Sequence, residues 1–183
     1  MDKLRIYNIA LGVFNIAPLS EEDLEDTEGH PEIQILDLYL PTAERKAIRE
    51  REWTFLEVKL DLGEDGGPEC GYKHTYKLPE GLFRLTRADG TYRVVGTKLL
   101  TNGAPHAYGI MNTLPDSGVP EDFYDLIAFA LAFYASPKLS PGDTKYQIAM
   151  NDYNTILQGL IMNDVQCQLR DSREEANGLG PYV

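Results

Sequence analysis

The sequence contains few of the side chains from which catalytic and metal sites are built. Two cysteines and three histidines occur among its 183 residues. Cys70 and His74 lie four positions apart, but no second pair follows at the spacing that a zinc site needs. The glycine-rich segment 63–67 is acidic and precedes Pro68, whereas a phosphate-binding loop carries a lysine. We therefore expect no catalytic residue, no metal ion and no cofactor, and we expect that the protein is not an enzyme.

Disulfides and membrane-spanning segments are not expected either. Cys70 and Cys167 are too few for a disulfide framework in a chain of this size, which predicts free thiols in a reducing compartment. No run of about eighteen apolar residues occurs, so no transmembrane helix and no membrane partner are expected. The stretch Leu11-Gly12-Val13-Phe14 is too short and too interrupted for the apolar region of a signal peptide.

Basic residues are missing from one long stretch of a chain whose formal net charge is −12. No Lys or Arg lies between Ile6 and Glu44, while acidic residues gather in segment 21–32. A protein that binds nucleic acid without sequence preference needs a basic face, so this function class is excluded. The basic residues then come together as Arg45, Lys46, Arg49 and Arg51.

This charge asymmetry has two interpretations. In an oligomer, an acidic patch of one subunit could meet a basic patch of the next, which makes Arg45, Arg49 and Arg51 candidate partner-binding residues. Alternatively, the acidic stretch is a solvated loop and the basic residues lie on a solvated helix face.

Apolar residues recur at helical spacing in four stretches. They predict helices over residues 2–14, 31–52, 120–136 and 140–170. Pro41 is expected to kink or split the second helix, because proline lacks a backbone donor. Pro137 is expected to end the third helix, and Ser140 is expected to cap the start of the fourth. The acidic segment 19–30 lacks periodicity, which predicts a loop.

Residues 54–112 combine β-prone runs with turn dipeptides and predict an inserted antiparallel β-meander. Asp89-Gly90 separates the runs 82–87 and 92–95 and is typical of a hairpin turn. Asn102-Gly103 is a second such turn, after which the chain can return as another strand. One face of this sheet should cover a core while the other faces water.

The last stretch, residues 171–183, has no apolar periodicity and contains two glycines and a proline, which predicts an extended tail. Its apolar residues are further candidate partner-binding residues: Leu179, Pro181, Tyr182 and Val183. The predicted fold class is therefore α+β. A helical bundle with an inserted antiparallel β-meander forms one domain over residues 1–170, and an extended C-terminal tail follows over 171–183.

The order of several short motifs resembles that of a known protein family. A helix leads into Trp53-x-Phe55, and the motifs that follow are Tyr76-x-Leu78-Pro79 with Arg84, Tyr92-x-Val94-x-Gly96, Leu99-Leu100-Thr101-Asn102 and Tyr108-x-Ile110. A proline-initiated helix at 120–136 and a last long helix complete the series. This order is similar to that of the head-to-tail adaptor proteins of tailed bacteriophages, the tail tubular protein A group of short-tailed phages. The resemblance covers roughly residues 4–168, and the acidic insertion at 20–30 and Pro41 depart from it.

The resemblance implies a structural protein of the virion. Such adaptors form a twelve-fold homo-oligomeric ring under the portal protein, contact a tail tube or nozzle protein, and continue the DNA channel through which the viral genome is ejected. DNA would pass through the ring without specific binding, and no catalysis is expected. The implied location is the neck of the virion, after tail assembly in the host cytoplasm. The alternative function is an acidic DNA-mimic or a regulatory binding protein.

Overall fold

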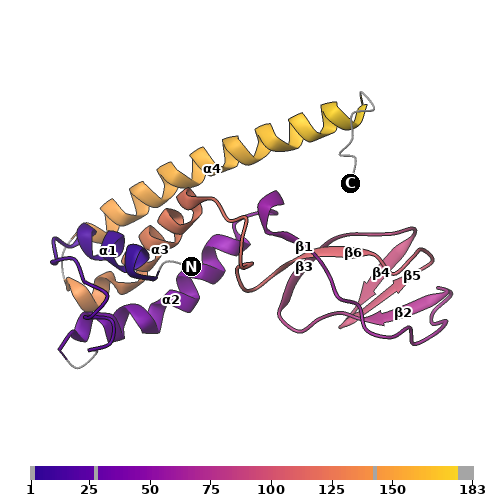
Figure 1. Ribbon diagram of the computed structural model, residues 1–183, viewed down its shortest axis with the longest axis horizontal. Coiled ribbons are helices and arrows are strands. Elements are labelled where there is room, and N and C mark those ends of the chain that lie inside the picture. Colours follow the sequence, from indigo (N-terminus) through magenta and orange to yellow (C-terminus); the bar gives the residue numbers. More distant parts are fainter. Residues whose placement is uncertain (1–2, 27–28, 142–143, 177–183) are drawn as a thin grey trace. The chain divides into compact units, whose positions relative to one another are not determined.

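A computed structural model of the protein describes residues 3–26, 29–141 and 144–176, with only the backbone described over 170–176 (Figure 1). The described helices are α1 (Lys3–Val13), α2 (Pro31–Arg49), α3 (Glu121–Leu139) and α4 (Lys145–Ala176), with a short 3₁₀ helix at Thr54–Leu56. The strands are β1 (Glu57–Lys59), β2 (His74–Lys77), β3 (Leu82–Ala88), β4 (Tyr92–Val95), β5 (Lys98–Thr101) and β6 (Ala107–Met111). This content confirms the predicted α+β class.

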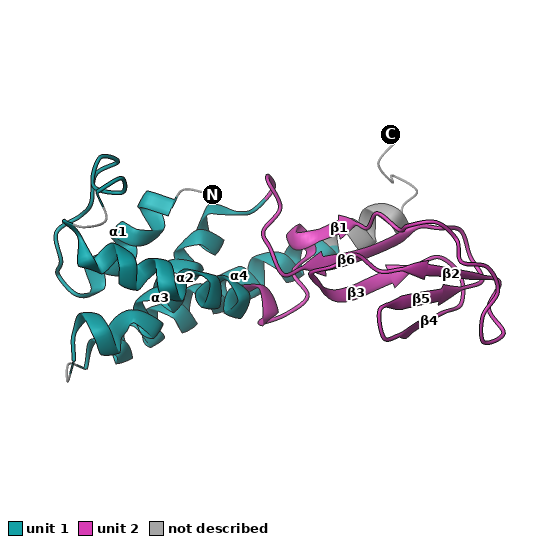
Figure 2. Ribbon diagram, turned by 90° about the horizontal axis from the view of Figure 1, so that it is seen from below, with its two compact units in different colours: residues 1–47, 119–183 teal, residues 48–118 magenta. Residues whose placement is uncertain are grey.

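The chain forms two compact units, which Figure 2 colours separately. Unit 1 comprises residues 1–47 and 119–183 and contains the helices, apart from the last two residues of α2. Unit 2 comprises residues 48–118 and contains every described strand, including the insertion predicted at 54–112. None of the described helices combines the length and the apolar composition that crossing a lipid bilayer requires.

Two predicted helix boundaries were wrong, at the end of α3 and at the start of α4. Pro41 does not split α2, which runs from Pro31 to Arg49, and α3 runs through Pro137 to Leu139. Ser140 ends α3, donating its N–H to the carbonyl oxygen of Ser136 at 2.9 Å, and so does not cap α4. A proline removes only one backbone hydrogen bond, and burial of an apolar helix face outweighs that local loss.

Helix α4 also extends further than the sequence predicted. It is a single helix of 32 residues that ends at Ala176, so residues 171–176 do not belong to an extended tail. Arg173, Glu174, Glu175 and Ala176 all have good helix propensity, which allows the helix to continue through Ala176. The remainder of the predicted tail lies outside the described residues.

Unit 1 is held together by an apolar core and by ion pairs at its edge. The inner face of α3 is completely buried at Phe123, Leu126 and Leu131, and α1 and α4 both pack against this helix. Arg5 of α1 bridges to α3 through Glu121 at 3.0 Å and Asp125 at 2.9 Å. The apolar stripes identified from the sequence therefore form the core of this unit.

Unit 2 contains two three-stranded antiparallel sheets, with orders β1-β6-β3 and β2-β5-β4. The predicted hairpin between residues 82–87 and 92–95 was wrong, because β3 pairs with β6 while β4 pairs with β5. Pairing runs from Leu82 opposite Met111 to Val95 opposite Lys98, so β3–β4 and β5–β6 are the two arms of one long hairpin. Its tip is the two-residue turn Gly96-Thr97.

The two predicted turn dipeptides lie where this long hairpin bends between the two sheets. Asp89 donates its N–H to the carbonyl oxygen of His106 at 3.1 Å, which continues the pairing through the bend. Thr101 Oγ1 donates to the carbonyl oxygen of Asp89 at 2.7 Å. A Cβ atom on Gly103 would lie 2.3 Å from that same oxygen, so the bend needs glycine at this position. Asp89-Gly90 and Asn102-Gly103 thus form a crossing of two arms, and neither is a hairpin tip.

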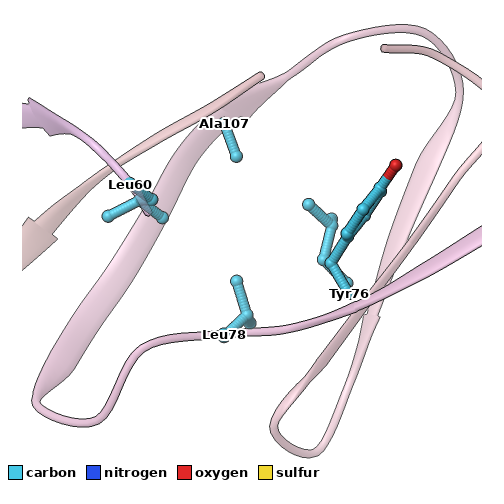
Figure 3. Close-up of a cluster of buried hydrophobic side chains, with 5 residues drawn as sticks. Leu60, Tyr76, Leu78 and Ala107 are labelled. Carbon is cyan, nitrogen blue, oxygen red and sulfur yellow. The ribbon is translucent and has the colours of Figure 1, made fainter. Parts of the chain in front are cut away.

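A small apolar cluster joins the two sheets (Figure 3). Leu60 and Ala107 lie in or next to the sheet β1-β6-β3. Tyr76, Leu78 and Leu99 lie in or next to the sheet β2-β5-β4, and all five side chains are buried. In Figure 3 the labelled side chains converge from both sides on one interior space. Because the long hairpin runs through both sheets, this cluster fixes the angle at which it bends.

Candidate functional site

Sites for metal chemistry are not found in the described part of the chain. Among the described side chains, those of residues 3–26, 29–141 and 144–169, no three His, Cys, Asp or Glu gather closely enough to hold a metal ion. Cys70 and Cys167 are exposed and free, as the sequence predicted. The expectation that the protein is not an enzyme stays a prediction.

His74 pairs with a carboxylate that organises a loop. Asp65 Oδ2 lies 2.6 Å from Nδ1 of His74, and its Oδ1 accepts the N–H groups of Gly67 at 2.9 Å and Thr75 at 3.1 Å. The hydrogen bond from His74 and then these two backbone donors lower the pKa of Asp65 to about 2. The Asp65 carboxylate therefore fastens loop 62–73 to the start of β2, which is a structural role.

This carboxylate predicts a pH dependence for the loop. A depressed carboxylate pKa contributes stability above its unfolded value of 3.8, and that contribution is lost as the pH falls toward 2. We expect the amide protons of Gly67 and Thr75 to lose protection from hydrogen exchange across this interval. Asp65→Asn should speed their exchange at neutral pH, whereas the neighbouring Glu64→Gln should not. Equal exchange in wild type and Asp65→Asn would contradict this role.

The acidic segment forms turns that are closed by its own side chains. Ser20 donates its N–H to Asp23 Oδ2 at 2.7 Å, and Ser20 Oγ accepts the N–H of Asp23 at 3.3 Å. His30 lies 3.0 Å from Glu32 Oε1 and 3.2 Å from Asp23 Oδ1. The hydrogen bond to Glu32 and the charge of Asp23 raise the pKa of His30. The predicted loop at 19–30 is thus free of helix where it is described, while residues 27–28 lie outside the described residues.

The three candidate arginines have different surroundings. Arg45 is exposed on α2, in unit 1. Arg49 donates through Nη2 to Oδ1 of Asn112 at 2.8 Å, and the Arg51 guanidinium lies 5.5 Å from the centroid of the Trp53 ring. Arg49 and Arg51 therefore take part in the packing of unit 2. A role in partner binding stays a prediction for all three.

Strand β4 presents apolar side chains to solvent at the edge of its sheet. All four of its residues are exposed, and Tyr92, Val94 and Val95 are large apolar groups. β4 pairs with β5 on one side and is the last strand in the order β2-β5-β4. An exposed apolar edge strand can pair with another chain unless charges or proline protect it. We call these three residues the β4 edge.

The second half of α4 presents an apolar stripe. Met162, Val165 and Leu169 are exposed and fall at i, i+3 and i+7, which places them on one face of the helix. A stripe of this kind on a surface helix is ordinarily covered by a packing partner. We call these residues the α4 stripe.

A third apolar surface is a groove in unit 1, where the end of α3 faces the start of α4. Its volume is about 580 Å³, and its lining residues are Phe133, Tyr134, Ser136, Pro137, Ser140, Thr144 and Tyr146. A neighbouring hollow of about 390 Å³ shares Phe133 and Tyr146 and reaches Met150 and Asn151 along α4. We call this combined surface the α3–α4 groove.

The sequence did not identify these three surfaces as candidate sites. Tyr92 and Val94 carry a β-strand pattern, but the pattern does not say which strand lies at an edge. On α3, Phe123, Leu126 and Leu131 are buried in the core, whereas Phe133 and Tyr134 line the groove. The four remaining candidates, Leu179, Pro181, Tyr182 and Val183, lie outside the described residues.

Known proteins give no independent guide to these surfaces. No protein-family model matches the sequence, and no curated protein is similar to it at a significant level.

Proposed function

We propose that this chain is a structural head-to-tail adaptor of a tailed bacteriophage, which assembles as a closed ring between the portal protein and the tail. The observation that carries the proposal is the set of three separate apolar surfaces, namely the β4 edge, the α4 stripe and the α3–α4 groove. Exposed apolar patches commonly mark sites of protein association.

The shapes of these surfaces are compatible with a ring. The α3–α4 groove is concave, whereas the α4 stripe and the β4 edge project from a helix and a strand. A groove receives a projecting surface and not another groove, so its contact joins two different surfaces of two copies, as a heterologous interface does. Heterologous contacts generate closed rings when the rotation between subunits closes. In such a ring, the surfaces that are not used between subunits remain available to bind the portal protein and a tail tube or nozzle protein.

The charge of the chain is compatible with a DNA channel. With a net charge of −12, a ring of many copies would offer few cationic contacts to phosphates, so DNA could pass without specific binding. The motif order from Trp53 to Ile110 adds the resemblance to phage adaptors as a separate line of support. The proposed location is the neck of the virion.

Mixing the purified chain with its portal protein tests the proposal. We expect electron microscopy to show a ring of density added coaxially to one face of the portal. Substituting the β4 edge with Val94→Lys should weaken this addition if the edge lies between subunits, whereas the exposed Leu38→Lys on α2 serves as a control. Portal particles that stay bare at high chain concentration would contradict the adaptor function.

The DNA-mimic alternative predicts a different partner. It requires acidic side chains that stay free to imitate phosphates along one face. In segment 21–32, Asp23 and Glu32 are already engaged with Ser20 and His30, which weakens this alternative. Capture of a host nuclease by the chain, with loss of capture on adding DNA, would favour it.

A further inference from the structure

The α3–α4 groove needs an occupant, and the chain itself supplies a matching segment. The groove is lined by the aromatic rings of Phe133, Tyr134 and Tyr146 together with Pro137. Residues 177–183 carry no charged side chain and include Leu179, Pro181, Tyr182 and Val183. Aromatic-lined grooves bind short extended segments that contain proline, because such segments lose little conformational freedom on binding.

Chain geometry shows that this segment cannot reach the groove of its own subunit. Asn151, the groove residue nearest to the end of α4, and Ala176 lie on the same helix and are separated by 25 positions. At about 1.5 Å of rise per residue, this end of the groove and the helix end lie about 37 Å apart. The seven residues from 177 to 183 span at most about 25 Å when fully extended. Val183 therefore stays about 12 Å short of its own groove.

We propose that residues 179–183 of one copy bind in the α3–α4 groove of a second copy. Only a neighbouring subunit can bring this segment to the groove, so each contact joins the α4 end of one chain to the α4 start of another. The contact joins two different surfaces, so successive copies can be linked head to tail in a ring, whereas two reciprocal contacts would close a dimer. It specifies how the ring proposed above is joined, and it rests on that proposal only for closure of the ring.

The energetics suit a contact that is weak alone and strong in an assembly. Tyr182 and Pro181 would stack on aromatic side chains, an interaction that adds to the burial of apolar area. Ordering a free segment opposes binding, so a single contact should be weak. In a ring the same contact recurs at every subunit, and the contacts then support one another through effective concentration.

A peptide titration tests the contact directly. A fluorescent peptide with the sequence of residues 177–183 is added to a chain that ends at Ala176, whose groove is intact and unoccupied by this segment. We expect saturable binding, and a loss of at least about tenfold in affinity with Tyr146→Ala, because this exposed tyrosine lines both hollows. Ile148→Ala is the matched control, since Ile148 is exposed on the same helix but does not line the groove. Absence of saturable binding, or equal binding by both variants, would overturn the proposal.

A mixing experiment separates this contact from the adaptor function. The chain ending at Ala176 keeps the groove, and the full chain with Tyr146→Ala keeps the segment. Neither should self-associate, but their mixture should form heterodimers and no larger species, as measured by analytical ultracentrifugation. If the chain ending at Ala176 still forms rings on the portal, the segment contact is wrong while the adaptor function stands. If the peptide binds the portal protein and not the truncated chain, the occupant proposed here is likewise wrong.

Discussion

Replacing Trp53 with alanine should lower the free energy of unfolding of unit 2 by about 3–5 kcal/mol. The side chain is 1% exposed and is among the largest completely buried groups in the described chain. Its ring lies 5.3 Å from the ring of Phe55, and the Arg51 guanidinium approaches it at 5.5 Å. Truncation removes the buried apolar area and leaves a cavity in its place.

Urea denaturation followed by circular dichroism measures this effect, because Trp53 is the single tryptophan and its fluorescence is lost with the substitution. Tyr92→Ala is the control, since Tyr92 is an exposed aromatic residue of the same unit and should shift the midpoint little. A midpoint for Trp53→Ala equal to that of Tyr92→Ala would contradict a core role for the tryptophan.

Gly103→Ala should produce the second largest loss of stability, of about 1–3 kcal/mol or more. The added Cβ atom would lie 2.3 Å from the carbonyl oxygen of Asp89 and 2.4 Å from its carbonyl carbon. Both are backbone atoms at the crossing of the two hairpin arms, so relief requires one arm to move. The Thr101–Asp89 hydrogen bond should weaken with that movement.

The glycine at position 63 provides a matched comparison. It lies in a loop of the same unit, its φ is ordinary, and a Cβ atom there would meet nothing within 4 Å. Gly63→Ala should therefore leave the melting temperature unchanged or raise it slightly, because it restricts the unfolded chain. If Gly103→Ala melts like Gly63→Ala, the crossing of the arms is not as tight as described.

Helix periodicity was the part of the sequence that carried reliable information about the fold. The apolar repeats of Ile6, Leu36 and Leu126 predicted helices that exist and bury those residues. The end of α3 was misplaced at Pro137 because the local cost of proline was weighed without the burial of the neighbouring residues. The end of α4 was misplaced because two downstream glycines were given more weight than the helix formers before them.

Strand pairing could not be derived from the turn dipeptides. Asp89-Gly90 and Asn102-Gly103 have the composition of hairpin tips. In the structure, however, the two glycines lie against each other's backbone in the bend, where a Cβ atom on either would be too close to the other arm. The real tip, Gly96-Thr97, has a weaker local signal. Pairing between β6 and both β1 and β3 depends on contacts over many residues, which local composition does not encode.

The candidate surfaces were beyond sequence reasoning for a related reason. Phe133 and Tyr134 continue the apolar pattern of α3 beyond the part that is buried, and only the placement of α4 shows that they line a groove. The sequence also could not show that Arg49 and Arg51 contact Asn112 and Trp53 of the same unit, and their role in partner binding stays a prediction. The sequence shows which residues could bind a partner, but tertiary packing decides which of them are exposed to solvent.

The mass of the complex between the chain and its portal protein tests the central claim most directly. Native mass spectrometry should show the portal assembly plus a fixed number of copies of the chain, twelve under the resemblance, with no stable intermediate numbers. The chain ending at Ala176 should add fewer copies without a fixed stoichiometry. Variable, concentration-dependent addition by the full chain, or no addition at all, would contradict its assignment as a ring-forming adaptor.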